Sequence, residues 1–88
     1  MIKGSPHNVL LHPYVTEKTL NLMENHNSLM FVVKEGSTKP QIRWAFEKLF
    51  EVKVESVNVK HSRFGKQAII KLTADYNAED IGMRIGIF

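Results

Sequence analysis

Cysteine is absent from the 88 residues, so disulfide frameworks, cysteine-based zinc sites and thiol nucleophiles are excluded. Long apolar runs are missing as well, because the longest, residues 29–33, is far short of the roughly 20 residues that span a bilayer. Residues 1–7 contain no apolar signal-peptide core and are expected to form a flexible N-terminus. These absences, which also fit a reducing compartment, predict one small, soluble, intracellular domain over residues 1–88.

Recognisable enzyme motifs are also missing. The chain has no glycine-rich phosphate loop and no nucleophile elbow, and its serines have no identifiable base partner. The histidines, His7, His12, His26 and His61, include no pair at the i, i+3 or i, i+4 spacing that would favour a metal site on a helix. We therefore expect no catalytic activity, no metal ion and no other cofactor.

The net charge of +3 is concentrated in one segment. Residues 56–74 contain four basic residues and no acidic one, whereas residues 75–88 contain three acidic residues and one basic residue, a net charge of −2. A basic segment on an otherwise near-neutral chain favours a polyanionic partner.

Hydrophobic spacing and capping residues predict the secondary structure. The clearest element is a helix that begins at a capping box, Thr38 to Gln41, and carries an apolar stripe at Ile42, Ala45, Phe46 and Leu49. Other signals predict strands at 8–11, 29–33, 55–60 and 67–73, a helix at about 17–24 capped by Thr16, and a helix between Asn77 and Gly86. The last two strands form a hairpin with a six-residue turn around Gly65. The order strand–helix–strand–helix–strand–strand–helix predicts an α+β domain with an antiparallel sheet.

The tip of this hairpin, residues 60–66, is the best candidate for a functional site. Three fixed positive charges and one histidine surround Phe64, whose ring is suited to stacking on a base or a sugar. The alternative is a solvated basic tip with Phe64 folded back onto the sheet.

Trp44 is a second candidate. It lies on the helix face opposite the apolar stripe, beside Gln41, Glu47 and Lys48. A lone tryptophan on a polar face often marks a contact with a partner. The alternative is that the first helix or the N-terminal tail covers it.

Ordered motifs extend over nearly the whole chain, from about residue 8 to residue 88. They are HPYVTEKT at 12–19, TKPQIR at 38–43, FEKLFEVKV at 46–54, VN at 57–58, and DYNAEDI with RIGIF at 75–88. Together they resemble the large-subunit ribosomal protein twenty-three family, in its archaeal type.

The resemblance implies a four-stranded antiparallel sheet with helices on both faces, in a structural protein of cytoplasmic ribosomes. It further implies binding to the third domain of large-subunit rRNA at the rim of the polypeptide exit tunnel, beside large-subunit protein twenty-nine. Factors that meet nascent chains, such as the signal recognition particle, dock at that rim. In bacterial members a glutamate at the position of Glu17 docks the chaperone trigger factor. For this chain the resemblance implies only the location, an exposed motif near the first helix, and not that chaperone. The resemblance implies no membrane and no small-molecule substrate.

Two features depart from the family pattern. Bacterial relatives insert a long basic hairpin into the tunnel, whereas the turn between Lys60 and Gln67 has only six residues, so we expect no tunnel insertion. Trp44 stands where relatives usually have a small or polar residue, so the resemblance does not cover its role. The long basic N-terminal extension of eukaryotic members is absent, which indicates the archaeal type.

The leading hypothesis is a structural rRNA-binding protein that also offers Glu17 and Trp44 for docking other proteins. The predicted rRNA-binding residues are His12, Thr16, Lys18, Lys39, Asn58, Lys60, His61, Arg63, Phe64 and Lys66. One alternative is a free RNA-recognition module, but residues 67–73 lack the aromatic side chains that such a sheet face needs. Another is an RNA-independent protein-docking adapter that uses Trp44 and Glu17.

Overall fold

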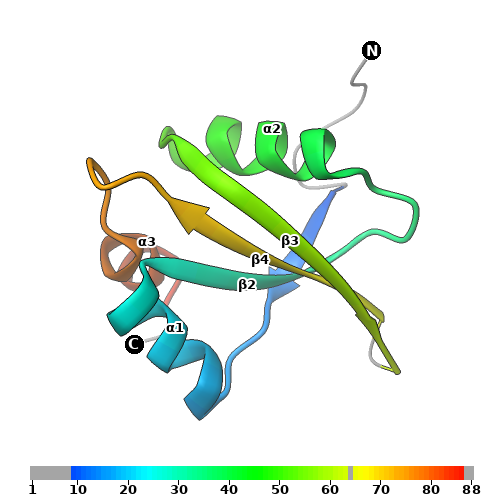
Figure 1. Cartoon of the computed structure of the whole chain (residues 1–88), viewed down its shortest axis with the longest axis horizontal. Coiled ribbons are helices and arrows are strands. Elements are labelled where there is room, and N and C mark those ends of the chain that lie inside the picture. The colour runs from blue at the N-terminus through cyan, green and yellow to red at the C-terminus, as the bar shows by residue number, and fades with distance from the viewer. Residues whose placement is uncertain (1–8, 64, 87–88) are drawn as a thin grey trace.

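The computed structural model describes residues 9–63 and 65–86. Its elements are β1 (Leu10–Pro13), α1 (Glu17–His26), β2 (Ser28–Val33), α2 (Lys39–Phe50), β3 (Val54–Ser62), β4 (Gly65–Leu72) and α3 (Ala78–Ile85) (Figure 1). The predicted order of elements and the α+β class are confirmed. The prediction of a flexible N-terminus over residues 1–7 lies outside the described residues.

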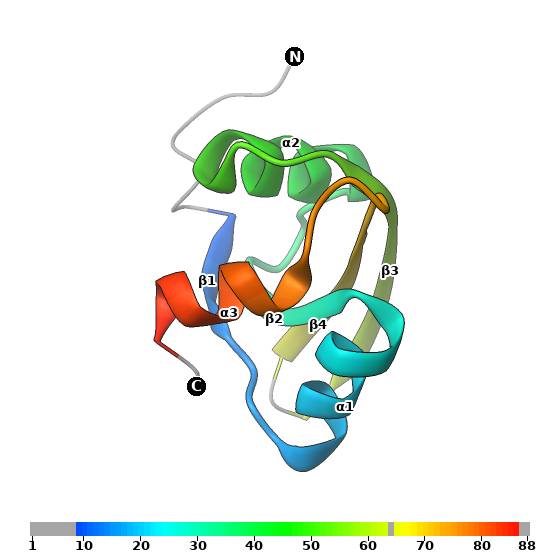
Figure 2. The ribbon, with the colours of Figure 1, turned by 90° about the vertical axis from the view of Figure 1, so that its left-hand side faces the viewer.

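The four strands form one antiparallel sheet in the order β1-β2-β4-β3. The sheet separates α2 from α1, and α3 lies at one end of the sheet (Figure 2). Helices therefore lie on both faces, as the resemblance implied. All six residues of β2 are buried, because this strand has a neighbouring strand on each side and a helix on each face. None of the helices that the structure describes is long and apolar enough to cross a membrane.

The core lies between α2 and the sheet. Ile42, Ala45 and Phe46 have no exposed surface, and the Phe46 ring meets the Phe31 ring of β2 edge to face with centroids 5.7 Å apart. At the start of α2 the Gln41 backbone N–H donates to Thr38 Oγ1 (3.3 Å). The Thr38 backbone N–H donates in return to Gln41 Oε1 (2.8 Å). The capping box and most of the apolar stripe are thus confirmed.

The β3–β4 hairpin is tighter than predicted. Ser62 pairs with Gly65 and His61 pairs with Lys66, so the connection has two residues instead of six. Polar side chains around Gly65 were assigned to the turn, but an exposed hairpin end accommodates polar residues within its strands. Gly65 has φ 108°, a conformation that other residues rarely adopt, and it begins β4 immediately after the reversal.

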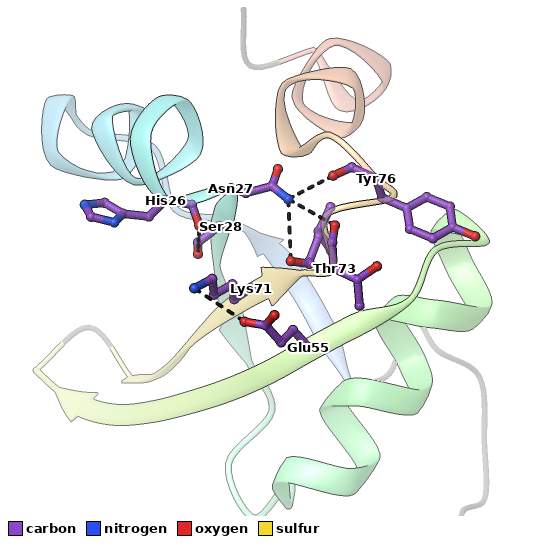
Figure 3. Close-up of polar contacts among 8 residues, drawn as sticks. His26, Asn27, Ser28, Glu55, Lys71, Thr73 and Tyr76 are labelled. Atoms are coloured by element: carbon purple, nitrogen blue, oxygen red, sulfur yellow. Dashed lines mark hydrogen bonds and ion pairs between the residues drawn. The ribbon is translucent and has the colours of Figure 1, made fainter.

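Asn27 holds the turn between α1 and β2. Its backbone is left-handed (φ 50°, ψ 40°) at the C-terminal cap of α1. Its side-chain Nδ2 donates to the carbonyls of Thr73 (3.2 Å) and Tyr76 (2.8 Å) (Figure 3). Its Oδ1 accepts from the Ala78 backbone N–H (2.7 Å). Asn27 therefore ties the end of α1 to the loop between β4 and α3.

We expect Asn27→Gly to lower the free energy of unfolding by about 2 kcal/mol, because it removes these hydrogen bonds but tolerates the left-handed backbone. Asn27→Ala removes the same hydrogen bonds and also places a residue with a Cβ atom in the left-handed conformation. We therefore expect it to lower the free energy of unfolding by about 3 kcal/mol. Urea denaturation of both variants and the wild type measures the difference. Unchanged unfolding midpoints would show that the Asn27 network does not stabilise the fold.

Candidate nucleic-acid interface

A polar strip runs along β3 on the sheet face that α1 shares. Strand alternation directs Val57 into the core, whereas Asn58 and Lys60 point to the opposite face and are exposed. Because β3 is an edge strand, a ligand can approach this strip along the open edge of the sheet as well as over its face. We call it the open face; it consists of Ser56, Asn58, Lys60 and Ser62 of β3 and Lys71 of β4.

A hollow of about 250 Å³ lies where the open face meets the segment that leads into α1. Two exposed lysines, Lys18 and Lys60, line it, and Met30 lines it from β2. Tyr14, Thr16 and Ser62 also line it, as does the buried Gln67, which is 2% exposed. We call this site the basic hollow.

Local structure at the start of α1 fixes two of these residues. The Thr19 backbone N–H donates to Thr16 Oγ1 (3.2 Å), and the Thr16 backbone N–H donates to Thr19 Oγ1 (2.7 Å). This reciprocal capping, together with Glu17 in the first turn, starts the helix where the sequence predicted it. Lys18 therefore stands on the first turn of a well-capped helix.

Strand register extends the site across the sheet. His12 pairs with Val32, Val32 pairs with Gln67, and Gln67 pairs with Lys60. Paired residues present their side chains on the same face, so one row leads from His12 on one edge strand to Lys60 on the other. Asn58 lies two residues before Lys60 on the same face. The predicted residues His12, Thr16, Lys18, Asn58 and Lys60 thus share one side of the molecule.

Two residues of the predicted hairpin cluster lie on the other face. Lys66 pairs with Val33, which belongs to the core side, and its Nζ donates to the Ser37 carbonyl. His61 pairs with Lys66, and its Nε2 lies 3.7 Å from Glu35 Oε1, with both side chains exposed. Strand alternation thus places His61 and Lys66 on one face of the sheet and Lys60 on the other, although all three are close together in the sequence.

The remaining predicted RNA contacts lie apart from the basic hollow. Arg63 is exposed in the turn between β3 and β4. Lys39 is exposed in the first turn of α2, the helix on the opposite face of the sheet. Phe64 lies outside the described residues.

Trp44 is half-buried and packs against the edge of the core. It lines a hollow of about 370 Å³ between α2 and β3, together with Lys39, Pro40, Arg43, Glu47 and Val57. The wall of this hollow is fixed by β3, because the Arg43 guanidinium donates to the Val54 carbonyl and Glu47 Oε2 accepts from the Val54 backbone N–H (2.9 Å). Trp44 thus lies half-buried in a hollow that Lys39 and Arg43 also line. Glu17 is exposed at the start of α1, next to the basic hollow.

Sequence reasoning missed Tyr14, Ser62 and Gln67 as lining residues of the hollow. Ser62 and Gln67 follow from strand alternation once the hairpin turn is known to have two residues. Tyr14 comes after β1, where its backbone N–H donates to the Met30 carbonyl (2.9 Å), a contact that no local pattern predicts. Among the residues that the structure describes, no three His, Asp or Glu side chains are grouped as metal ligands.

A small α+β domain that presents lysines, hydroxyls and amides on an open sheet face is typical of nucleic-acid-binding proteins. The sequence model of the family described as Ribosomal protein L23 matches residues 8–79, and the chain belongs to this family.

Curated relatives agree with this assignment. The chain is 48% identical over 84 residues to the Large ribosomal subunit protein uL23 of Methanothermobacter thermautotrophicus, covering 94% of this chain and 98% of the relative. It is 42% identical over 83 residues to the protein of the same name from Methanobrevibacter smithii (93% and 96% covered). For that of Picrophilus torridus the identity is 43% over 79 residues (90% and 96% covered). The relatives are archaeal, so the predicted family and its archaeal type are confirmed.

Proposed function

We propose that this chain binds large-subunit rRNA through the basic hollow and the open face, as a structural constituent of the large ribosomal subunit. Its family consists of ribosomal proteins, and its curated relatives carry the name of a large-subunit protein. The chain is accordingly a ribosome-bound, cytoplasmic protein of translation, with no catalytic activity. The observation that carries the proposed interface is the convergence of Lys18 and Lys60 with the hydroxyls of Tyr14, Thr16 and Ser62.

The chemistry of the basic hollow suits an RNA backbone. Two ammonium groups neutralise phosphates and release their counterions, which supplies most of the sequence-independent affinity. The hydroxyls of the exposed residues Thr16 and Ser62 match the ribose 2′-hydroxyl as donors and acceptors. His12 and Asn58 lengthen the contact along the same face, so the footprint extends beyond one phosphate.

The other predicted rRNA contacts form a second group around the hairpin end and the start of α2. We propose that Arg63 and Phe64 extend the footprint from the tip, and that His61, Lys66 and Lys39 meet RNA that passes over the opposite face. Lys66 contributes least, because its ammonium group already donates to the Ser37 carbonyl. The exposed Glu35 carboxylate, with Oε1 3.7 Å from His61 Nε2, repels a phosphate that approaches His61.

The finer placement on the ribosome is also a proposal. The family resemblance supports binding to the third rRNA domain at the rim of the exit tunnel, beside large-subunit protein twenty-nine and within reach of the signal recognition particle. Glu17 and Trp44 are accessible and are proposed as docking points for such exit-site factors. A connection of two residues between β3 and β4 supports a hairpin that stays outside the tunnel.

Binding to a fragment of large-subunit rRNA, measured by filter retention as the salt concentration rises, tests the proposal. The logarithm of the association constant should fall linearly with the logarithm of the salt concentration, by about 0.9 per neutralised phosphate on duplex RNA, by analogy with DNA. An affinity that does not depend on salt would contradict a phosphate-based interface.

A further inference from the structure

A groove of about 610 Å³ lies at the end of the sheet opposite the hairpin. It is formed by the C-terminal ends of α1 and α2, the loop after β4 and the length of α3. Met23 and Ile81 are each 2% exposed and give it an apolar floor, which Phe50 and Val52 extend. Neither the proposed rRNA contacts nor the proposed docking residues lie in this groove.

The rim of the groove is strongly acidic. Its acidic residues come from α1, from the cap that ends α2, from the loop after β4 and from α3: Glu24, Glu51, Asp75, Glu79 and Asp80. Among the described residues that line the groove, Arg84 is the only lysine or arginine, and its Nη1 donates to the Phe50 carbonyl (3.4 Å). Five acidic groups and one basic group give a net charge of −4 on a chain whose total charge is +3.

Helix ends add to this negative potential. The caps that end α1 and α2, Asn27 and Glu51, both line the groove, so the negative ends of two helix dipoles lie beside it. The positive end of α3 also lies there, but Glu79 and Asp80 in its first turn offset it. Phosphates are therefore repelled from this groove and cations are attracted.

The groove is built on fixed structure. The Asn27 side chain donates from the end of α1 to the carbonyl of Tyr76 (Figure 3). It also accepts from the backbone N–H of Ala78, the first residue of α3. Three walls of the groove are thereby held together before any ligand arrives, which lowers the entropic cost of binding.

We propose that this groove binds a lysine- or arginine-rich peptide segment of a protein partner, with apolar side chains of the segment on the floor and its cations at the acidic rim. An apolar floor with charged walls suits an amphipathic chain better than a small ion, and the sign of the charge excludes a nucleic acid. The eight residues of β4 (Gly65–Leu72) separate the groove from the hairpin by about 23 Å, at roughly 3.3 Å per residue. The protein can therefore bind RNA at one end of the sheet and a basic peptide at the other.

A fluorescein-labelled synthetic peptide in which lysines alternate with leucines is the probe, and its anisotropy with the full chain gives the affinity. Asp75→Asn/Asp80→Asn should weaken binding about tenfold, because two exposed attractions are lost. The matched control is Glu35→Gln/Glu55→Gln, which removes the same charge away from the groove and should have less than about a twofold effect. Circular dichroism checks that both variants fold.

Each outcome decides between occupants. A peptide with serine in place of leucine should bind more weakly, and amide shifts in NMR spectra should map to residues around Glu51 and Asp75. If both double variants weaken peptide binding equally, or if the serine peptide binds as tightly as the leucine peptide, binding depends only on the net charge of the protein. Either result would overturn the proposal. Self-association without peptide binding would assign the groove to a second copy. The affinity of Asp75→Asn/Asp80→Asn for the rRNA fragment should not fall. A failure of the groove proposal would therefore not count against the proposed rRNA interface.

Discussion

Replacing Lys18 and Lys60 together with alanine should weaken binding to a large-subunit rRNA fragment about 30- to 100-fold at about 0.1 M salt. Both ammonium groups line the basic hollow, where two charge-assisted contacts to phosphate are worth about 2 to 3 kcal/mol together. The slope of log affinity against log salt should become shallower by about 1.8 if both phosphates are lost from duplex RNA.

The control is a pair of lysines that lies away from the hollow. Lys48 and Lys53 are exposed on α2 and just before β3, so Lys48→Ala/Lys53→Ala removes the same charge without touching the open face. We expect less than about a threefold loss for this variant. Lys66→Ala should also have a small effect, because Lys66 already donates to the Ser37 carbonyl. If the control pair weakens binding as much as the Lys18/Lys60 pair does, the affinity comes from net charge and not from the hollow.

Replacing Phe46 with alanine should lower the free energy of unfolding by about 3 to 5 kcal/mol. Phe46 has no exposed surface, and its ring contacts Phe31 edge to face and Phe50 at a centroid distance of 4.7 Å. Alanine would leave a cavity between α2 and β2, in the core between this helix and the sheet. A small domain has roughly 5 to 15 kcal/mol of stability in total, so the variant should be partly unfolded at moderate temperature.

Urea denaturation followed by circular dichroism measures this loss. Phe46→Leu keeps most of the buried volume and should lose about 1 to 1.5 kcal/mol. A loss below about 1 kcal/mol for Phe46→Ala would mean that the α2–β2 contact does not support the fold to the extent that its burial implies.

Capping boxes and hydrophobic patterns predicted most of the fold, because each depends on residues that are close together in the sequence. The capping box of α2 depends on Thr38 and Gln41 alone, and the apolar run of β2 reflects burial on both faces. The length of the hairpin turn was overestimated, because the polarity of the residues does not distinguish an exposed strand end from a turn. The pairing of His61 with Lys66 is decided by the ladder of hydrogen bonds, which composition does not reveal.

The candidate site was predicted in part. Lys18 and Lys60 were both named, but they are 42 positions apart in the sequence, and only the packing of α1 on β2 within the folded sheet brings them to one hollow. Strand alternation places Lys60 and Lys66 on opposite faces of the sheet, although they are close together in the sequence. The acidic groove was not anticipated at all, because Glu24, Glu51 and Asp75 come from three distant segments.

Sedimentation of the tagged chain in extracts of cells that produce it is the most direct test of the central claim. The chain should sediment with the large ribosomal subunit, the Lys18→Ala/Lys60→Ala variant should shift toward the top of the gradient, and nuclease digestion should release the wild-type chain. A chain that stays in the soluble fraction would contradict an rRNA-bound constituent and favour the protein-docking adapter.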